Sequence, residues 1–597
     1  MNEKYNWQLT DIFKTDEDFY NSKKLVEDKL IKIEEYKGKL CDSADNLYNC
    51  YNLYEELLMI FEKVYSYGMF KYHLNMADQE GIKKFKEVES LSADVEVKTS
   101  FMVPEITYSD ENKIKQFFKE KKDLEKYRRS IYEILEKKPH ILSKEEENLL
   151  ANYSEIFSGP ENIFDIMTNA EFKFGILIDE NGKEVELTEN NYTKYIKSNN
   201  SNVRKQAFSL LYKKYSEYIN TITEIYLTNV KCSSVTAKLR KYSSSLEEAV
   251  IYDDASIKVY NALMESVNNN LASNHEYIKL KKKLSKQKEY HMYDLYVNPF
   301  ENNDDNISFE DAKNEVLDAL SILGENYTSK LQEAFDNNWI DVFEKPNKRG
   351  GAYSSGVYGM HPFVLMSFTN TKRDVSTIAH ELGHSMHSYF AEKNQNILDA
   401  NYTIMVAEVA STVNEILLSE YQIAHEKDNK KKAEIVYELL EMIRATFFRQ
   451  SMFAEFEKII HEKVENGEAL SSENLNDIYY NLNQKYFGND IIVDKEIQFE
   501  WARIPHFYSD FYVYKYATGI SAAIYIANKI LKHENGYLEK YISMLSQGKM
   551  KKSIDLLKMV DVDLENVNLY DEVIKYFNEK MDILKKAIWE EKNNGRS

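Results

Sequence analysis

The sequence H-E-L-G-H at residues 380–384 constrains the fold more tightly than any other stretch of this 597-residue chain. Residues four positions apart lie one turn apart on one face of an α-helix, so on a helix both histidines can reach a single ion. Glu381 follows the first histidine by about 100° of rotation, which places its carboxylate where it can take a proton from metal-bound water. Asp374 is a candidate N-cap, and Gly383, which costs a helix about 1 kcal/mol against Ala, indicates close packing at its backbone. The spacing therefore predicts a helix that carries part of a metal site.

A tetrahedral zinc site needs a third protein ligand, and several acids follow the motif. Glu392 lies on the same helix but about 12 Å along it, too far to share the ion. A second helical pattern at residues 401–425 carries Glu408 and Glu415, which are about 10 Å apart, so only one of them can be a ligand. Asp399 in the connecting segment is a third candidate. Spacing slightly favours Glu408, because a helical hairpin brings the early turns of its second helix back beside the first.

Long helices are expected over most of the chain, because glycine occurs 18 times and proline only 7 times. Residues 172–187 are the exception: two short strand-like runs flank Asn181-Gly182, which predicts a β-hairpin. A second strand-like run at residues 361–368 follows a glycine-rich segment and precedes the metal helix. Pro362 fits an edge strand better than a central one.

The charge and the cysteines exclude several classes of function. The net charge is −21 with no basic block, so nucleic acid and anionic membranes are not expected as partners. Three cysteines without metal-ligand spacing indicate a reducing compartment. With no apolar run long enough for a membrane span and a polar start, the chain is expected to be cytoplasmic.

The two helical patterns together, at residues 380–387 and 407–415, resemble the oligoendopeptidase F group of the thimet-oligopeptidase family of zinc peptidases. In that family the motif reads H-E-x-G-H-x-x-H, and the glutamate equivalent to Glu408 is the third ligand. Further stretches that resemble the group span nearly the whole chain: residues 7–13, 291–296 and 503–519.

The resemblance implies a mainly α, two-lobed zinc-peptidase fold with a deep central channel and a small β-sheet beside the zinc helix. The expected domains are a helical lobe at residues 1–189, which ends in the hairpin, and a catalytic domain at residues 190–597. The implied function is hydrolysis of internal peptide bonds in short unfolded peptides by a monomer or small homo-oligomer. One Zn²⁺ ion would be held by His380, His384 and Glu408, with its water activated by Glu381.

Two neighbours of the ligands, Glu415 and His387, are candidates to orient them. For the oxyanion of the reaction, the resemblance implies donors from the segment at residues 504–519. His506 and Tyr514 are the favoured donors, followed by Tyr508 and Tyr512, which are also candidates for substrate binding.

The glycine-rich segment adds Gly356, Tyr358 and Gly359 as candidate substrate-binding residues, because peptidases commonly pair a peptide backbone with a sheet edge. An ordinary buried strand after a glycine-rich turn is an equal alternative. The loop at residues 291–305 has either a substrate-facing role or a packing role.

Two other functions fit the motifs. A carboxypeptidase of similar helical build would need a group for the terminal carboxylate, and the sequence reveals none. A catalytically idle protein that binds metal or peptide would share the ligands but not the turnover.

Overall fold

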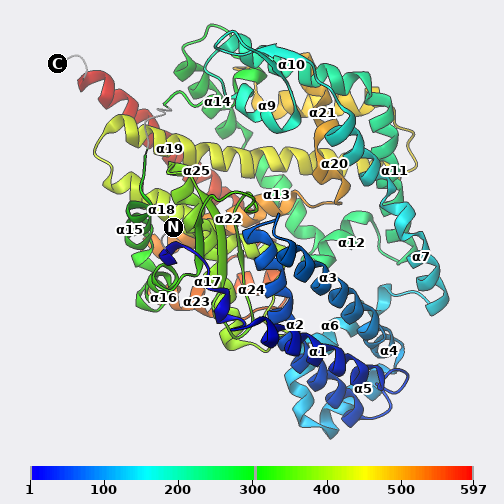
Figure 1. Ribbon diagram of the computed structural model, residues 1–597. Helices are drawn as coiled ribbons and strands as arrows, with labels where there is room; N and C mark the ends of the chain where they lie inside the picture. Colours follow the sequence, from blue (N-terminus) through cyan, green and yellow to red (C-terminus); the bar gives the residue numbers. More distant parts are fainter. Residues whose placement is uncertain (1–2, 301–305, 595–597) are drawn as a thin grey trace. The chain divides into compact units, whose positions relative to one another are not determined.

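The computed structural model describes residues 3–300 and 306–594 of the chain (Figure 1). Within these ranges most residues are helical and the strands are short, which confirms the expected mainly α fold. None of the helices in the described ranges is long and apolar enough to cross a membrane.

The chain forms two compact units, each assembled from three segments. The first contains residues 1–141, 304–418 and 526–561, and the second contains residues 142–303, 419–525 and 562–597. The expected division after residue 189 is not a boundary of these units. The hairpin belongs to the second unit, because its strand β1 (Ile176–Ile178) packs on α10 (Ser201–Glu217), where the Gln206 side chain accepts a hydrogen bond from the Ile178 amide at 3.1 Å.

The first unit opens with a series of helices whose starts are fixed by polar caps. Thr15, Ser43, Asp78 and Asp110 each accept a hydrogen bond from an amide in the first turn of the helix that follows. The helices are α1 (Asp16–Glu34), α2 (Ala44–Leu74), α3 (Gln79–Thr99), α4 (Met102–Tyr108), α5 (Glu111–Glu120) and α6 (Arg128–Lys137). Later segments of the unit add α15 (Phe309–Leu320), α16 (Glu325–Asp336), α17 (Lys372–Asn394), α23 (Tyr537–Leu545) and α24 (Ser553–Lys558).

A three-stranded sheet in the first unit precedes α17 and packs against it. Its strands are β3 (Ile340–Phe343), β4 (Tyr353–Ser355) and β5 (Phe363–Phe368), in the order β3-β5-β4, with β5 parallel to β3 and antiparallel to β4. The prediction of an edge strand after Pro362 is therefore wrong. Pro362 stands just before β5, where its missing N–H interrupts no pairing, so β5 can be central. The edge strand is β4, in the glycine-rich segment.

The second unit contains the predicted hairpin, in which β1 pairs antiparallel with β2 (Glu184–Glu186) around Gly182 at φ 77°. A π-helical turn at Arg444–Arg449 joins α19 to α20. The helices of the unit are α7 (Lys144–Phe157), α8 (Gly159–Asp165), α9 (Glu189–Ile196), α10, α11 (Ile219–Leu239), α12 (Ser245–Tyr252), α13 (Ile257–Asn269), α14 (Leu271–Ser285), α19 (Asn429–Ile443), α20 (Gln450–Glu465), α21 (Ser472–Phe487) and α25 (Val567–Asn594). Two further helices, α18 (Ile404–His425) and α22 (Tyr514–Leu531), begin in one unit and end in the other.

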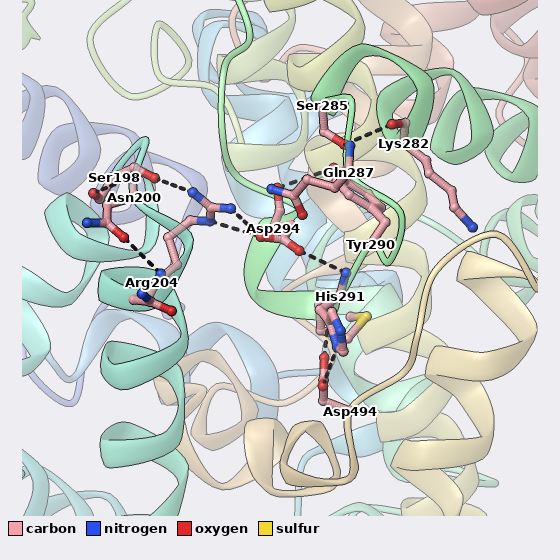
Figure 2. Close-up of polar contacts among 12 residues, drawn as sticks. Ser198, Asn200, Arg204, Lys282, Ser285, Gln287, Tyr290, His291, Asp294 and Asp494 are labelled. Atoms are coloured by element: carbon pink, nitrogen blue, oxygen red, sulfur yellow. Dashed lines mark hydrogen bonds and ion pairs between the residues drawn. The ribbon is translucent and has the colours of Figure 1, made fainter.

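The loop that begins at His291 is tied into the second unit by a buried polar network (Figure 2). The Arg204 guanidinium donates to Asp294 at 3.0 Å, and both side chains are buried. Asp294 also accepts from the His291 amide at 3.0 Å, while Nδ1 of His291 lies 2.8 Å from a carboxylate oxygen of Asp494. This part of the loop therefore has a packing role. The rest of the loop, residues 301–305, lies outside the described residues.

Candidate metal centre

The helix of the H-E-L-G-H motif, α17, begins with a capping box. The Thr371 hydroxyl accepts a hydrogen bond from the Asp374 amide at 3.3 Å, and the Asp374 carboxylate accepts one from the Thr371 amide at 2.8 Å. Asp374 is therefore the third residue of the helix. The prediction that it is the N-cap is wrong. Thr371 takes the N-cap position because its hydroxyl, three residues earlier, reaches the unpaired amide.

His380, His384 and Glu408 converge on one point. The Nε2 atoms of the histidines are 3.1 Å apart, and they lie 3.7 Å (His380) and 3.9 Å (His384) from the two carboxylate oxygens of Glu408. Ligands about 2 Å from a tetrahedral ion are roughly 3.3 Å from one another, so these separations fit one ion held by three side chains. All three side chains are partly exposed, which leaves access for a further ligand.

Glu408 reaches the histidines because α18 passes very close to α17. A Cβ at Gly383 would lie only 2.7 Å from the carbonyl oxygen of Ala410, so no larger residue fits without a shift. One turn along α18, Nδ2 of the Asn414 side chain donates to the carbonyl oxygen of Ala379 at 3.0 Å. The close packing inferred from Gly383 is therefore present, and it fixes the distance between the two helices that carry the candidate ligands.

Glu415 orients His380. Its carboxylate forms a hydrogen bond with Nδ1 of His380, and because a carboxylate only accepts, that nitrogen carries the proton and the Nε2 lone pair faces the other two ligands. Burial lowers the pKa of His380, but the hydrogen bond to Glu415 and the neighbouring carboxylates outweigh it and raise this pKa overall. Burial, helped by His380, lowers the pKa of His384 to about 4, which keeps this imidazole neutral and able to bind a metal.

Glu381 is buried beside the group, with 7% of its surface exposed. Burial raises its pKa to about 7, against the opposing effect of His380, and the charge of Glu408 adds to the rise. The amide of Ser354, on the edge strand β4, donates to the Glu381 carboxylate. A carboxyl group whose pKa lies near neutral is suited to take up a proton and release it again.

The other candidates near the motif have different partners. Asp399 is fully buried and accepts a hydrogen bond from Ser130 at 2.9 Å, so its carboxylate serves the packing of the first unit. Glu392 is not part of the His–His–Glu group. His387 stacks on the Tyr402 ring at 3.6 Å between centroids, and burial lowers its pKa to about 3. Of the two residues expected to orient the candidate ligands, Glu415 contacts His380, whereas His387 packs as a neutral ring against Tyr402.

In the glycine-rich segment, the structure gives a structural reason for each of the three candidate residues. A Cβ at Gly356 would lie 3.1 Å from that of Ser388, within a crowded contact with α17. The Tyr358 hydroxyl donates to the carbonyl oxygen of Gln395 at 2.9 Å. Gly359 has a φ of 76° with open space around it, so its backbone conformation requires glycine while its volume does not.

In the second unit, His506, Tyr512 and Tyr516 form a cluster. The His506 and Tyr512 rings stack at 5.8 Å, the two tyrosine rings lie 5.5 Å apart, and the Tyr516 hydroxyl is 3.4 Å from Nε2 of His506. Burial lowers the pKa of His506, so the ring is neutral near pH 7. Tyr516 lies in the same segment at residues 504–519, although it is not one of the four favoured candidates.

The placement of two other tyrosines differs from the expectation. Tyr514 is fully buried, and its hydroxyl donates to Asp253 at 2.9 Å. Tyr508 is also buried and stacks on Phe164 at 4.6 Å. Neither side chain offers a donor to a substrate in this arrangement, because the helical core of the second unit takes up both rings.

The fold and the site together define a class. A mainly helical protein in which a helix carries H-E-x-x-H, and a facing helix adds a glutamate to the two histidines, is a metallopeptidase of helical build. The family model described as Peptidase family M3 matches residues 194–575, and the model described as Oligopeptidase F matches residues 105–174. The chain belongs to peptidase family M3.

Individual relatives agree over almost the whole length. The chain is 39% identical to Oligopeptidase PepF of Bacillus subtilis, over 98% of this chain and 88% of that protein. It is 36% identical to the Oligoendopeptidase F homolog of Lactococcus lactis, over 98% of both chains. The solved structure of oligoendopeptidase-F from Enterococcus faecium matches with a TM-score of 0.73 at 32% identity, over 96% of this chain and 99% of that one. The chain is therefore a peptide-hydrolysing metalloendopeptidase, and the family resemblance inferred from the sequence is confirmed.

Proposed function

We propose that the chain is a zinc-dependent endopeptidase that cleaves internal bonds of short unfolded peptides, with one catalytic ion held by His380, His384 and Glu408. The observation that carries the proposal is the convergence of these three side chains, with separations of 3.1, 3.7 and 3.9 Å between donor atoms. Two neutral imidazoles and one carboxylate are a usual ligand set of catalytic zinc.

A bound Zn²⁺ would lower the pKa of water and polarise the peptide carbonyl. The protein supplies the proton transfers. Glu381 takes the proton of the attacking water and returns it to the leaving amine, and its pKa of about 7 suits both steps. Glu415 holds His380 in the tautomer that presents Nε2 to the ion.

We further propose that His506, Tyr512 and Tyr516 supply hydrogen-bond donors to the substrate oxyanion. The support is the family resemblance of this segment together with the contacts among the three side chains. Tyr516 takes the place of Tyr514 in this proposal, because the Tyr514 hydroxyl already donates to Asp253.

For the substrate backbone we propose the edge strand β4 and the following Gly356, Tyr358 and Gly359. An edge strand has unpaired backbone groups that can bind an extended peptide whatever its side chains. Ser354 in β4 already contacts Glu381, which places this edge beside the proposed general base.

We also propose a cytoplasmic location, since the three cysteines are free thiols, as is usual in a reducing compartment.

The test is cleavage of an internally quenched peptide blocked at both ends, assayed after chelation and after Zn²⁺ is restored. We expect cleavage of an internal bond that is lost on chelation and recovered with Zn²⁺. A carboxypeptidase would leave the doubly blocked peptide intact. A protein that only binds metal or peptide would show no turnover under either condition, so each rival has its own outcome.

A further inference from the structure

A second cluster of potential metal ligands lies in the second unit, apart from every residue assigned above. Glu457 and His461 are one turn apart on α20, and Asp510 stands in the segment ahead of α22. One oxygen of each carboxylate and one imidazole nitrogen all lie within 4.8 Å of one another. Nε2 of His461 is 3.8 Å from Asp510 Oδ1, close to the separations found at the first centre.

Two of the atoms in this cluster, one from Glu457 and one from His461, are buried and lack hydrogen bonds. Glu457 is 0% exposed and His461 is 1% exposed. Oε2 of Glu457 and Nε2 of His461 have no hydrogen-bond partner anywhere in the described part of the chain. Such atoms are uncommon in folded proteins, because each loses its hydration without compensation.

The surrounding hydrogen bonds fix the tautomer of His461. The Ser245 hydroxyl donates to Glu465 at 2.6 Å, so its oxygen accepts from Nδ1 of His461 at 2.9 Å. In a neutral ring the proton is then on Nδ1, and the Nε2 lone pair points into the cluster. A serine thus gives His461 the same ligand-ready tautomer that Glu415 gives His380 in the first centre.

Hydrogen bonds from residues outside the cluster hold its two carboxylates in place. Oε1 of Glu457 accepts from the Phe511 amide at 2.6 Å, and Asp510 accepts from Ser233 and, at 3.3 Å, from Asn229. Each carboxylate keeps an oxygen within reach of His461.

The cluster has an unbalanced charge. In the described ranges no lysine or arginine forms an ion pair with Glu457 or Asp510, and Lys515, whose charge acts on Glu457, pairs with Asp253. Burial raises the pKa of Glu457 and raises that of Asp510 to about 6, while it lowers the pKa of His461 to about 3. One buried and one partly buried carboxyl group beside a neutral imidazole need either bound protons or a cation to be stable.

We propose that Glu457, His461 and Asp510 form a second metal site, which binds a divalent first-row transition ion such as Zn²⁺ or Mn²⁺. The imidazole disfavours Ca²⁺ and Mg²⁺, which prefer sites made of oxygen ligands. The Asp510 side chain is 28% exposed and provides the side from which an ion can enter.

The site has a structural consequence for the segment that leads to Tyr512. Phe511 adopts a φ of 51°, which is unfavourable for a residue with a bulky side chain, and its amide is held by Glu457. An ion that fixes Glu457 and Asp510 would lock both sides of this strained residue. The proposed site is thus a positioning device for the aromatic segment and has no catalytic part of its own.

The test counts bound metal by mass spectrometry after Zn²⁺ or Mn²⁺ loading and desalting. We expect two equivalents in the unmodified chain, one in His461→Gln and one in the double variant His380→Ala/His384→Ala. The exposed His425→Gln should keep two equivalents and controls for the loss of a histidine.

The double variant also tests the site without any change to it, in case His461→Gln does not fold. Titrated with Zn²⁺ or Mn²⁺, it should bind one equivalent and gain thermal stability. If it binds none while the unmodified chain binds one, protons occupy the buried cluster and the inference is overturned. If instead the double variant binds as much metal as the unmodified chain, the catalytic assignment fails and the second site stands.

Discussion

The two His–carboxylate clusters of this chain make an instructive comparison. In both, two ligands lie four residues apart on a helix and a third comes from another segment, and in both a hydrogen bond to Nδ1 sets the tautomer of a histidine. They differ in exposure and in neighbours. The first centre has ligand side chains 19–43% exposed and a glutamate whose pKa is about 7 beside them, whereas Glu457 and His461 are fully buried with no such base.

The comparison shows that the i, i+4 spacing on a helix creates the capacity to bind an ion but not the capacity for chemistry. Chemistry needs an accessible position for the substrate and a group that moves protons, and both come from what surrounds the helix. Single substitutions can change these surroundings one at a time.

The largest effect is expected from Glu381→Gln, which removes the proton-accepting carboxylate and leaves the three ligands in place. It should convert the first centre into one that binds an ion without chemistry, as proposed for the second. We expect kcat to fall by roughly 10³-fold or more, with unchanged zinc content, because a general base is lost. A peptide-cleavage assay measures the fall in kcat, and metal analysis measures the zinc content.

As the matched control, the exposed Glu462→Gln should retain activity. Turnover near the normal level in Glu381→Gln would disprove the general-base role.

Next in size is the effect of Gly383→Ala, which tests how the helix contact sets the first centre. The new Cβ would lie 2.7 Å from the Ala410 carbonyl, so α17 and α18 must move apart. We expect a loss of roughly 1–3 kcal/mol in the free energy of unfolding, as for other overpacked sites, together with weaker zinc binding. Thermal unfolding with and without Zn²⁺ is the measurement.

Gly159 is the control for this substitution, because no atom lies within 4 Å of its Cβ position. Gly159→Ala should not lower stability, and zinc binding should not change. Equal behaviour of the two variants would mean that the helix contact does not control the site.

A further substitution, Glu415→Gln, probes the tautomer control that the clusters share. An amide in place of the carboxylate weakens the hold on the Nδ1 proton of His380. We expect zinc affinity to fall by about 10–100-fold, as is typical when the partner of a metal-bound histidine is changed. Activity should return at high Zn²⁺, and activity that stays low at saturating Zn²⁺ would instead indicate a direct role in turnover.

The smallest effects separate the aromatic residues of the second unit. Tyr514→Phe should cost about 1–2 kcal/mol of stability, because Asp253 loses a hydrogen bond, with little change in kcat. Tyr516→Phe should lower kcat without a comparable loss of stability. Steady-state kinetics and thermal unfolding of both variants decide between them, and the reverse pattern would restore Tyr514 as the donor.

How much of this site could be predicted depends on how local each interaction is. The helix, the histidine pair and Glu381 follow from residues within five positions of one another, so the spacing alone was sufficient. The prediction of Asp374 as the N-cap is wrong, because the Thr371 hydroxyl caps the helix and Asp374 completes the capping box. Pro362 suggested an edge strand, but the chain places it just before a central one.

Among the acids, the spacing left Asp399, Glu408 and Glu415 open, since a rigid helix excludes only pairs that are too far apart. The approach of α18 to α17 decided between them: it sets Glu408 opposite both Nε2 atoms and Glu415 behind the ring of His380. The roles of the tyrosines were equally undetermined, because Tyr512, Tyr514 and Tyr516 share one run and differ only in which side chains the core encloses.

The sequence by itself determined the helical character of the chain, the ligand-bearing face of α17 and the family. Each of these depends on which residue types occur and on their spacing along the chain. Only the tertiary structure decided which carboxylate meets the histidines, which tyrosines are buried, and that Glu457 and His461 meet Asp510 some 50 positions along the chain. Contacts between distant segments depend on how the helices pack, and packing is a property of the whole core that no single stretch contains.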